Sequence, residues 1–276
     1  MLINEKQSIL VPIDFLPQSL IGLKQSYNLA KFTKSKLVLL YVMHKGGEKR
    51  VEEFESLAQK TKEESGLDVE TVTLEGEPFA TISKKANEIK ASLVIMGIDS
   101  NVQFKNFLGM NPLTKFIFAC PCPVITIRGT ENREGCKNII LPFDLTPESR
   151  EKVSFAVQLA RYYGSDIRIV SVFPPDDDKY ENKLLPYLQQ VKKFIKNEGI
   201  HCTNKSIPSN TAAQAIVDYA ISHEGDLLIQ MNQKDMSFKE YINGTVGQKI
   251  LDICRIPVMT INPMKRESMS HFGSGM

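Results

Sequence analysis

Several features that would assign a protein to a special class are absent from this sequence of 276 residues. No apolar run is long enough to cross a bilayer, and there is no N-terminal signal pattern, so we expect a cytoplasmic protein without membrane contact. The net charge is only +2, which gives no electrostatic reason to expect nucleic acid as a partner. The composition, with 42% hydrophobic and 24% charged residues, is that of a globular protein.

Cysteine and histidine are too scattered to indicate a disulfide framework or a metal site. The five cysteines are an odd number, and only Cys120 and Cys122 are close together. No second cysteine pair or nearby histidine completes a ligand set, so we predict that both are buried as small apolar side chains. The four histidines stand singly, and no metal is predicted. The cluster Asp176-Asp177-Asp178 could hold a divalent cation, but it is more typical of a helix start.

The common catalytic and nucleotide motifs are missing as well. There is no GxxxxGK[ST] loop, no GxGxxG after the first strand and no GxSxG nucleophile elbow. Carboxylates are plentiful, but no pair is singled out by its spacing. We therefore predict no catalytic residues.

The sequence does contain one pattern that is written twice. SLVIMGIDSNVQFKNFLGMNPLTKFIFACPCPVITI (92–127) has a near-copy, DLLIQMNQKDMSFKEYINGTVGQKILDICRIPVMTI (226–261), at an offset of 134. Self-similarity over this length indicates two domains of the same fold. We predict domains at 1–130 and 136–263, joined by the polar segment 129–136 and followed by a mobile tail, 264–276.

Within each copy, hydrophobic periodicity predicts strands that alternate with helices. This order implies an α/β fold with a parallel sheet, in which ligands collect at the carboxyl ends of the strands. The predicted strands of the first copy are 8–13, 37–42, 69–74, 93–96 and 124–127, with helices from Pro17 and over 48–65, 82–89 and 110–119. In the second copy, the clearest strands are 138–142 and 200–207, and the clearest helix is 212–222.

The strand ends VPIDF and LPFDL, the strand–loop–helix unit and the closing PCPVITI and RIPVMTI resemble the universal stress protein family. The resemblance covers both copies and implies two tandem Rossmann-like domains of the adenine nucleotide alpha hydrolase type. Each would have a five-stranded parallel sheet in the order 3-2-1-4-5, flanked by helices. In the nucleotide-binding branch of this family, an aspartate that ends the first strand faces the adenine, and the motif G-x-x-G-x9-G-[ST] wraps the phosphates.

In the first copy this pattern is only partly kept. Gly97 matches the first glycine of the motif. The motif also expects a glycine directly before Asn111, but Met110 stands there and Gly109 lies one residue early. Small residues at a helix N-terminus suit a phosphate, but Asn111 could instead cap the helix without any ligand. The candidate nucleotide positions of the first copy are Asp14, Gly97, Ser100, Gly109 and Asn111.

The second copy departs from the pattern in the opposite way. Gly244-Thr245 matches the G-[ST] end of the motif. Asn232 and Asp235 stand at the two earlier glycine positions, and aligned from Gly244 the loop is one residue shorter than the motif. An aspartate repels a polyphosphate by about 1–4 kcal/mol unless a cation intervenes. Thr245 could instead be a plain helix cap. The candidate positions of the second copy are Asp144, Gly244 and Thr245.

Because neither loop is complete, two functions remain open. The first is a non-catalytic stress-response protein that acts through contacts with an unknown protein partner and has degenerate nucleotide sites. The second is a regulator in which one repeat binds ATP with magnesium and hydrolyses it slowly at most. Loss of the loop glycines favours the first function, and Asp14 and Asp144 could simply cap the helices that follow them.

The closing strands of the two copies, VITI and VMTI, are apolar and stand at a sheet edge in the implied order. In the family these strands make the dimer contact. The resemblance therefore implies an intramolecular pseudo-dimer with 124–127 beside 258–261, and it leaves a homodimer of whole chains open. Replacing Ile125 and Val258 together by aspartate is expected to expose this apolar surface.

Overall fold

The computed structural model describes residues 3, 6–43, 50–99, 111–131, 135–232 and 245–263, and strands and helices alternate through both repeats. The first repeat contains β1 (Ile9–Ile13), α1 (Pro17–Thr33), β2 (Leu37–Met43), α2 (Val51–Ser65), β3 (Val69–Glu75), α3 (Pro78–Glu88), β4 (Leu93–Gly97), α4 (Pro112–Ala119) and β5 (Val124–Ile127). The second contains β6 (Asn138–Pro142), α5 (Pro147–Tyr163), β7 (Asp166–Phe173), α6 (Asp178–Asn197), β8 (Cys202–Pro208), α7 (Ala212–Ser222), β9 (Leu227–Met231), α9 (Val246–Ile253) and β10 (Val258–Ile261). The predicted tail 264–276 lies outside the described residues.

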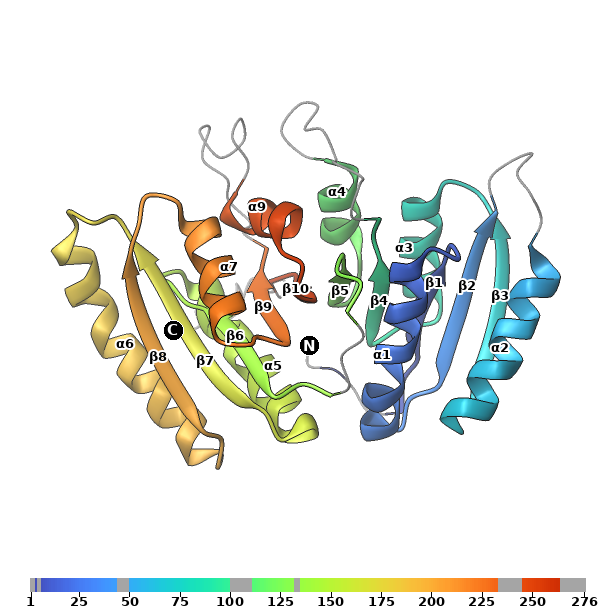
Figure 1. Ribbon diagram of the computed structural model, residues 1–276, viewed down its shortest axis with the longest axis horizontal. Coiled ribbons are helices and arrows are strands. Elements are labelled where there is room, and N and C mark those ends of the chain that lie inside the picture. The colour runs from blue at the N-terminus through green and yellow to red at the C-terminus, as the bar shows by residue number, and fades with distance from the viewer. Residues whose placement is uncertain are drawn as a thin grey trace, which may run out of the picture.

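The strands of the described residues form one ten-stranded sheet, in the order β3-β2-β1-β4-β5-β10-β9-β6-β7-β8 (Figure 1). Each repeat has the predicted order 3-2-1-4-5, and its strands pair in parallel. The predicted contact between the closing strands is also present, because β5 and β10 pair antiparallel with Ile125 opposite Met259. The two repeats therefore share one continuous sheet.

Helices cover both faces of this sheet, which explains why the inner strands, unlike the edge strands β3 and β8, are apolar without alternation. In β2, the neighbouring residues Leu39 and Leu40 are both fully buried but belong to cores on opposite faces. One core packs under α1, α2, α5 and α6, and the other packs under α3, α4, α7 and α9.

Contacts outside the sheet also join the repeats. Phe32 of α1 stacks on Tyr162 of α5 with ring centroids 6.3 Å apart, and the two residues are 130 positions apart in the sequence. Ile3 is buried against the second repeat, where its backbone N–H donates to Gln158 Oε1 at 3.0 Å. Gln158 Nε2 donates back to the Ile3 carbonyl at 2.7 Å. These contacts bring the start of the chain onto the second repeat.

Two local predictions are confirmed. Cys120 and Cys122 are buried where α4 turns into β5, with their sulfur atoms 3.9 Å apart. Asp177 caps α6, because its Oδ1 accepts from the Tyr180 N–H at 2.9 Å. No helix of the described residues is long and apolar enough to cross a membrane. Within the same ranges, no group of three or more His, Cys, Asp or Glu side chains could hold a metal ion.

Candidate functional site

The helix that follows the loop begins with a capping side chain in each repeat. Asn111 is almost fully buried, and its Oδ1 accepts from the Thr114 N–H at 2.8 Å. Thr245 forms a capping box with Gln248: Thr245 Oγ1 accepts from the Gln248 N–H at 3.2 Å, and Gln248 Oε1 accepts from the Thr245 N–H at 2.9 Å. Both side chains therefore do what the capping alternative predicted.

Strand register corrects the alignment of the second loop. Gly97 pairs with Ile127, and Met231 pairs with Ile261, so Met231 occupies the place of Gly97 at an offset of 134. The caps Asn111 and Thr245 are also 134 residues apart, so the two loops have equal length. The expectation of a shorter second loop, with Asn232 at the first glycine position, was wrong by one residue. The candidates Ser100, Gly109 and Gly244 lie outside the described residues.

Gly97 has a structural reason to be glycine. A Cβ atom at this position would lie 2.2 Å from the backbone carbon of Gln18 and 2.2 Å from the Ser19 nitrogen. Real Cβ atoms do not approach backbone that closely, so only glycine lets the first turn of α1 pack against the end of β4. This contact accounts for Gly97 without a ligand.

A cavity of about 660 Å³ opens in the first repeat at the carboxyl ends of β1, β2 and β4. This is where ligands bind in parallel α/β sheets. The cavity brings together two of the predicted positions, Asp14 and Gly97, with side chains that the sequence did not single out. Its lining is Pro12, Ile13, Asp14, Phe15, Leu16, Leu40, Tyr41, Val42, Arg50, Glu77, Pro78, Phe79, Ile82, Met96, Gly97, Ile98 and Asp99.

Phe15 is held in this cavity in a costly conformation. Its φ of 64° is left-handed, which is rare for a bulky residue, and such strain costs on the order of 1–3 kcal/mol. The ring packs edge-on against Tyr41, with centroids 5.4 Å apart, and the Arg50 guanidinium carbon lies 4.0 Å from the ring centre. Leu145, the counterpart in the second repeat, does not share this conformation. Strain of this kind concentrates at functional sites.

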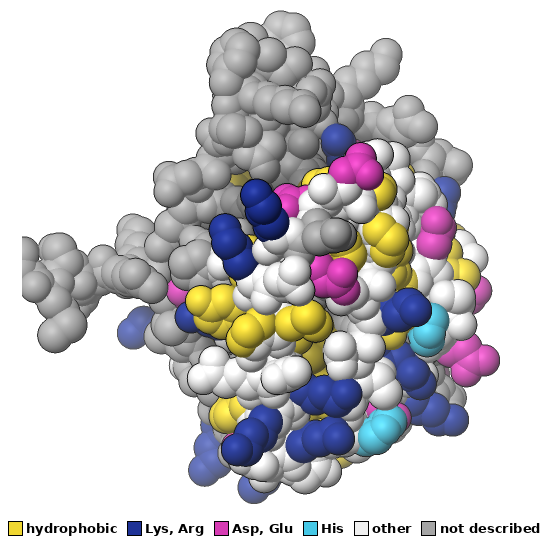
Figure 2. Space-filling view, turned by 90° about the vertical axis from the view of Figure 1, so that its left-hand side faces the viewer, with side chains coloured by type: hydrophobic (Ala, Val, Ile, Leu, Met, Phe, Trp, Pro, Cys, Tyr) yellow, Lys and Arg dark blue, Asp and Glu magenta, His cyan; other side chains and the backbone are white. Residues whose placement is uncertain are grey.

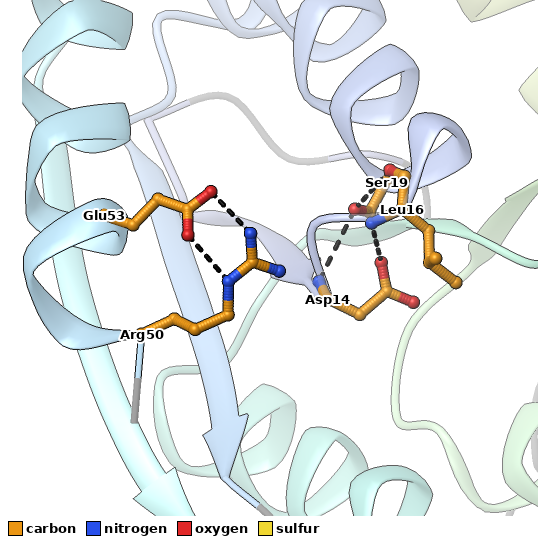
Figure 3. Close-up of polar contacts among 5 residues, drawn as sticks. All are labelled: Asp14, Leu16, Ser19, Arg50 and Glu53. Carbon is orange, nitrogen blue, oxygen red and sulfur yellow. Dashed lines mark hydrogen bonds and ion pairs between the residues drawn. The ribbon is translucent and has the colours of Figure 1, made fainter. Parts of the chain in front are cut away.

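Arg50 and Asp14 approach the cavity from different elements (Figure 3). Arg50 precedes α2 and holds Glu53 through two hydrogen bonds of 2.6 Å. Asp14 follows β1 and is exposed, and its Oδ1 accepts from the Leu16 N–H at 3.0 Å. The carboxylate thus supports the turn into α1, although Leu16 rather than Asp14 is the helix N-cap. The first repeat presents both a cation and a carboxylate at one cavity.

The matching aspartate of the second repeat, Asp144, is bound to its own neighbours. Its Oδ1 accepts from the Thr146 N–H at 2.9 Å and from the Ser149 hydroxyl at 2.6 Å, and it also accepts from the Thr146 hydroxyl. Burial alone would raise the pKa of Asp144, but the Lys152 ammonium and these hydrogen bonds hold it below its usual value. The predicted capping role is confirmed in part: Asp144 holds Thr146, which caps α5.

Lys152 is the residue of the second repeat that the sequence pattern did not reveal. It occupies the place of Gly22 in the first repeat, 130 residues earlier, and is almost fully buried. Burial lowers the pKa of Lys152 to about 8, although the Asp144 carboxylate opposes this shift. A lysine on an amphipathic helix normally faces water, so only the packed structure shows this one inside.

The chain is an α/β protein of two tandem Rossmann-like repeats, and a cavity opens at the strand ends of the first repeat. The chain belongs to the universal stress protein family, whose model matches residues 6–128 and 135–262.

Individual proteins are similar to this chain in sequence or in fold. Universal stress protein A of Salmonella typhi is 29% identical over 111 residues, which are 36% of this chain and 77% of that protein. A universal stress protein from Archaeoglobus fulgidus DSM 4304 has a similar fold, with a TM-score of 0.73 and 16% identity over 96% of this chain and 100% of that one. A protein of Pseudomonas aeruginosa PAO1, described as functionally unknown, has a TM-score of 0.72 and 20% identity over 95% of this chain and 94% of that one.

Proposed function

We propose that this chain is a stress-response protein whose first repeat binds an adenine nucleotide, while its second repeat has a structural role. The observation that carries the proposal is the cavity of about 660 Å³ lined by Asp14, Phe15 and Arg50. Small-molecule sites have volumes of about 300–1,000 Å³ and combine apolar walls with a few polar groups.

The chemistry of the lining suits the parts of a nucleotide. Val42 and the ring of Phe15 offer apolar surface to a base, and the Asp14 carboxylate can accept hydrogen bonds from an amino or hydroxyl group. Arg50 brings a positive charge to the same cavity, and it can meet a phosphate by exchanging its pair with Glu53 for the ligand. ATP with magnesium is therefore the first ligand to test, followed by the smaller adenine nucleotides.

The second repeat supports a different role. The Asp144 carboxylate is satisfied by Thr146 and Ser149 and faces the buried charge of Lys152. A ligand amine or hydroxyl would have to displace these internal partners. We therefore assign the nucleotide to the first repeat alone.

The proposal includes binding but no catalytic step. Among the described residues that line the cavity there is no Ser, Thr, Cys, His or Lys to act as a nucleophile or as a base of suitable pKa. A bound nucleotide would instead stabilise the first repeat. Because the two repeats share one sheet, it would also change the affinity of the chain for its protein partners.

A second candidate is a protein that acts through contacts alone, with both nucleotide sites degenerate. The observation in its favour is that Asn111 and Thr245 are both occupied as helix caps. In this case no nucleotide would bind at physiological concentration, and a protein partner would carry the function.

Titration calorimetry of the nucleotide-stripped chain with ATP and magnesium separates the two candidates. We expect about one site per chain, and we expect Phe15→Ala to weaken binding at least tenfold because it removes an aromatic wall. The matched control is Leu145→Ala at the equivalent place in the second repeat, which should leave the affinity unchanged. No binding at millimolar ATP would overturn the nucleotide proposal, and equal losses in both variants would overturn the assignment to the first repeat.

A further inference from the structure

The two ends of the sheet are formed by equivalent edges of the two repeats. β3 closes one end and pairs with β2, and β8 closes the other end and pairs with β7. These edges lie at opposite ends of the molecule, each beside its own helix, α2 or α6 (Figure 1). An edge strand presents backbone N–H and C=O groups that can pair with another strand.

The end formed by α2 and β3, the acidic end, has an excess of negative charge. Residues 51–75 contain eight acidic residues and two lysines. All eight are exposed, and within the described part of the chain, ion pairs with Lys36, Arg50 and Lys60 offset three of them. The acidic residues are Glu52, Glu53, Glu55, Glu63, Glu64, Asp68, Glu70 and Glu75.

The end formed by α6 and β8, the basic end, has the opposite charge. Residues 178–208 contain six lysines and three acidic residues. Figure 2 shows Lys and Arg side chains beside hydrophobic ones on this end of the molecule. The apolar part includes Leu185, Tyr187 and Phe194, which are 38%, 37% and 44% exposed. The lysines are Lys179, Lys183, Lys192, Lys193, Lys196 and Lys205.

We infer that the basic end of one chain docks against the acidic end of a second copy of this chain. α2 and α6 lie on the same face of the sheet, so a head-to-tail arrangement brings the acidic helix beside the basic helix. β3 and β8 belong to repeats whose strands run in opposite directions, so the two edges would meet antiparallel, as β5 and β10 do within the chain. Opposite charges then face each other along both the helices and the strands.

Protection of the edges against aggregation does not account for this pattern. Charged side chains on an edge strand commonly block its pairing with another edge. The same sign of charge on both edges would block every pairing between copies. Here the signs differ, so each edge repels its own kind and attracts the other. The exposed apolar residues of the basic end add surface that docking would cover.

A second copy is favoured over a general anionic partner because the matching surface is part of the same chain. The net charge of the whole chain is only +2, which gives little attraction to nucleic acid or to an acidic membrane. A head-to-tail dimer still has one free basic end and one free acidic end, so association should continue beyond a dimer as concentration rises.

Sedimentation velocity of the full chain over a range of concentrations, in 20 mM and in 500 mM NaCl, tests the docking. Salt shortens the Debye length from about 10 Å at 0.1 M to about 3 Å at 1 M, so we expect association at low salt to weaken at least tenfold at high salt. A basic-end variant, Lys192→Glu with Lys193→Glu and Lys196→Glu, and an acidic-end variant, Glu52→Lys with Glu63→Lys and Glu75→Lys, should each fail to self-associate.

A mixture of the two variants provides the decisive measurement. The basic-end variant has two acidic ends, whereas the acidic-end variant keeps its basic end and has a second end with five acidic residues and five lysines. The mixture should therefore associate although neither variant does alone. The control reverses three exposed lysines on other surfaces, Lys84→Glu with Lys90→Glu and Lys115→Glu, and should associate like the wild type. A wild type that stays monomeric at low salt, variants that still self-associate, a mixture that does not associate, or a control that loses association would overturn the proposal.

Discussion

The side-chain amide of Asn262, at the end of the second repeat, donates to the backbone carbonyl of Ile117 in the first repeat at 2.8 Å. The same amide donates to the Cys120 carbonyl at 3.0 Å. The last carbonyls of a helix have no partner within it, so Asn262 supplies donors that α4 lacks. The end of one repeat thus completes a helix of the other, so we expect the two repeats to stabilise each other.

Asn262→Ala should therefore destabilise the whole chain. The substitution leaves the Cys120 carbonyl without this donor and leaves the Ile117 carbonyl only the Cys120 N–H at 3.3 Å. An unsatisfied buried group costs about 1–3 kcal/mol. Urea denaturation should show this loss as a lower midpoint. Gln189→Ala, at an exposed position of α6, is the control and should change the midpoint little. Equal midpoints for the two variants would mean that Asn262 contributes nothing to the contact.

The pairing of β5 with β10 predicts a larger effect. Ile125 and Val258 are both buried in this contact, so Ile125→Asp with Val258→Asp places two charges where they have no water. We expect most of the chain to become insoluble, or its melting temperature to fall by more than 10 °C, since each buried charge costs several kcal/mol. Asn204→Asp on the exposed edge strand β8 is the control. A soluble double variant with an unchanged melting temperature would contradict the proposed role of this contact.

Much of the fold could be predicted because its signals are local. Continuous apolar runs predict the inner strands. The resemblance to the universal stress protein family implies the strand order, and because the sequence pattern is repeated, the same order applies to both halves. Asn111 and Thr245 were identified as potential caps because capping depends on residues three positions apart. The functions of Gly97, Phe15 and Lys152 could not be predicted in the same way.

These three residues depend on packing between distant segments. Gly97 is needed because α1, some 80 residues earlier, passes directly over it. The left-handed backbone of Phe15 could not be predicted from its residue type, because phenylalanine normally has a negative φ. Lys152 has the helical position of a small residue in the first repeat, and only the structure shows that its ammonium is inside.

Gly97→Ala should damage the fold rather than a ligand contact. Its Cβ would lie 2.2 Å from backbone atoms of α1, so either the helix or the strand must move. We expect a loss of at least 2 kcal/mol by urea denaturation, within the range of about 1–3 kcal/mol or more for overpacking. Gly22→Ala is the matched control, since its Cβ would have ordinary contacts of 3.6 Å or more. It should be neutral or stabilising, because alanine is the better helix former by about 1 kcal/mol.

The contrast between these two glycines also limits how a nucleotide site can be tested. A loss of binding in Gly97→Ala would reflect the displaced α1 as much as a lost phosphate contact. If Gly97→Ala were as stable as Gly22→Ala, the close approach would have been relieved at no cost, and Gly97 would regain its interpretation as a ligand position.

The buried charge of Lys152 predicts a dependence of stability on pH. Burial lowers its pKa in the folded chain to about 8, from an ordinary value of 10.5. Below pH 8 the lysine is protonated in both states, and the folded chain bears the full cost of the buried charge. Between about pH 8 and 10.5 the unfolded chain binds more protons than the folded chain, so stability rises with pH, by about 3 kcal/mol in total.

Lys152→Met isolates this contribution because methionine fills a similar volume without a charge. The free energy of unfolding, measured by urea from pH 7 to 10.5, should rise for the wild type relative to Lys152→Met by about 3 kcal/mol, since the other titrating groups are common to both chains. Lys24→Met, at an exposed position of α1, should run parallel to the wild type. Parallel curves for all three chains would mean that Lys152 reaches water in the folded state, and Asp144 would then be available to a ligand of the second repeat.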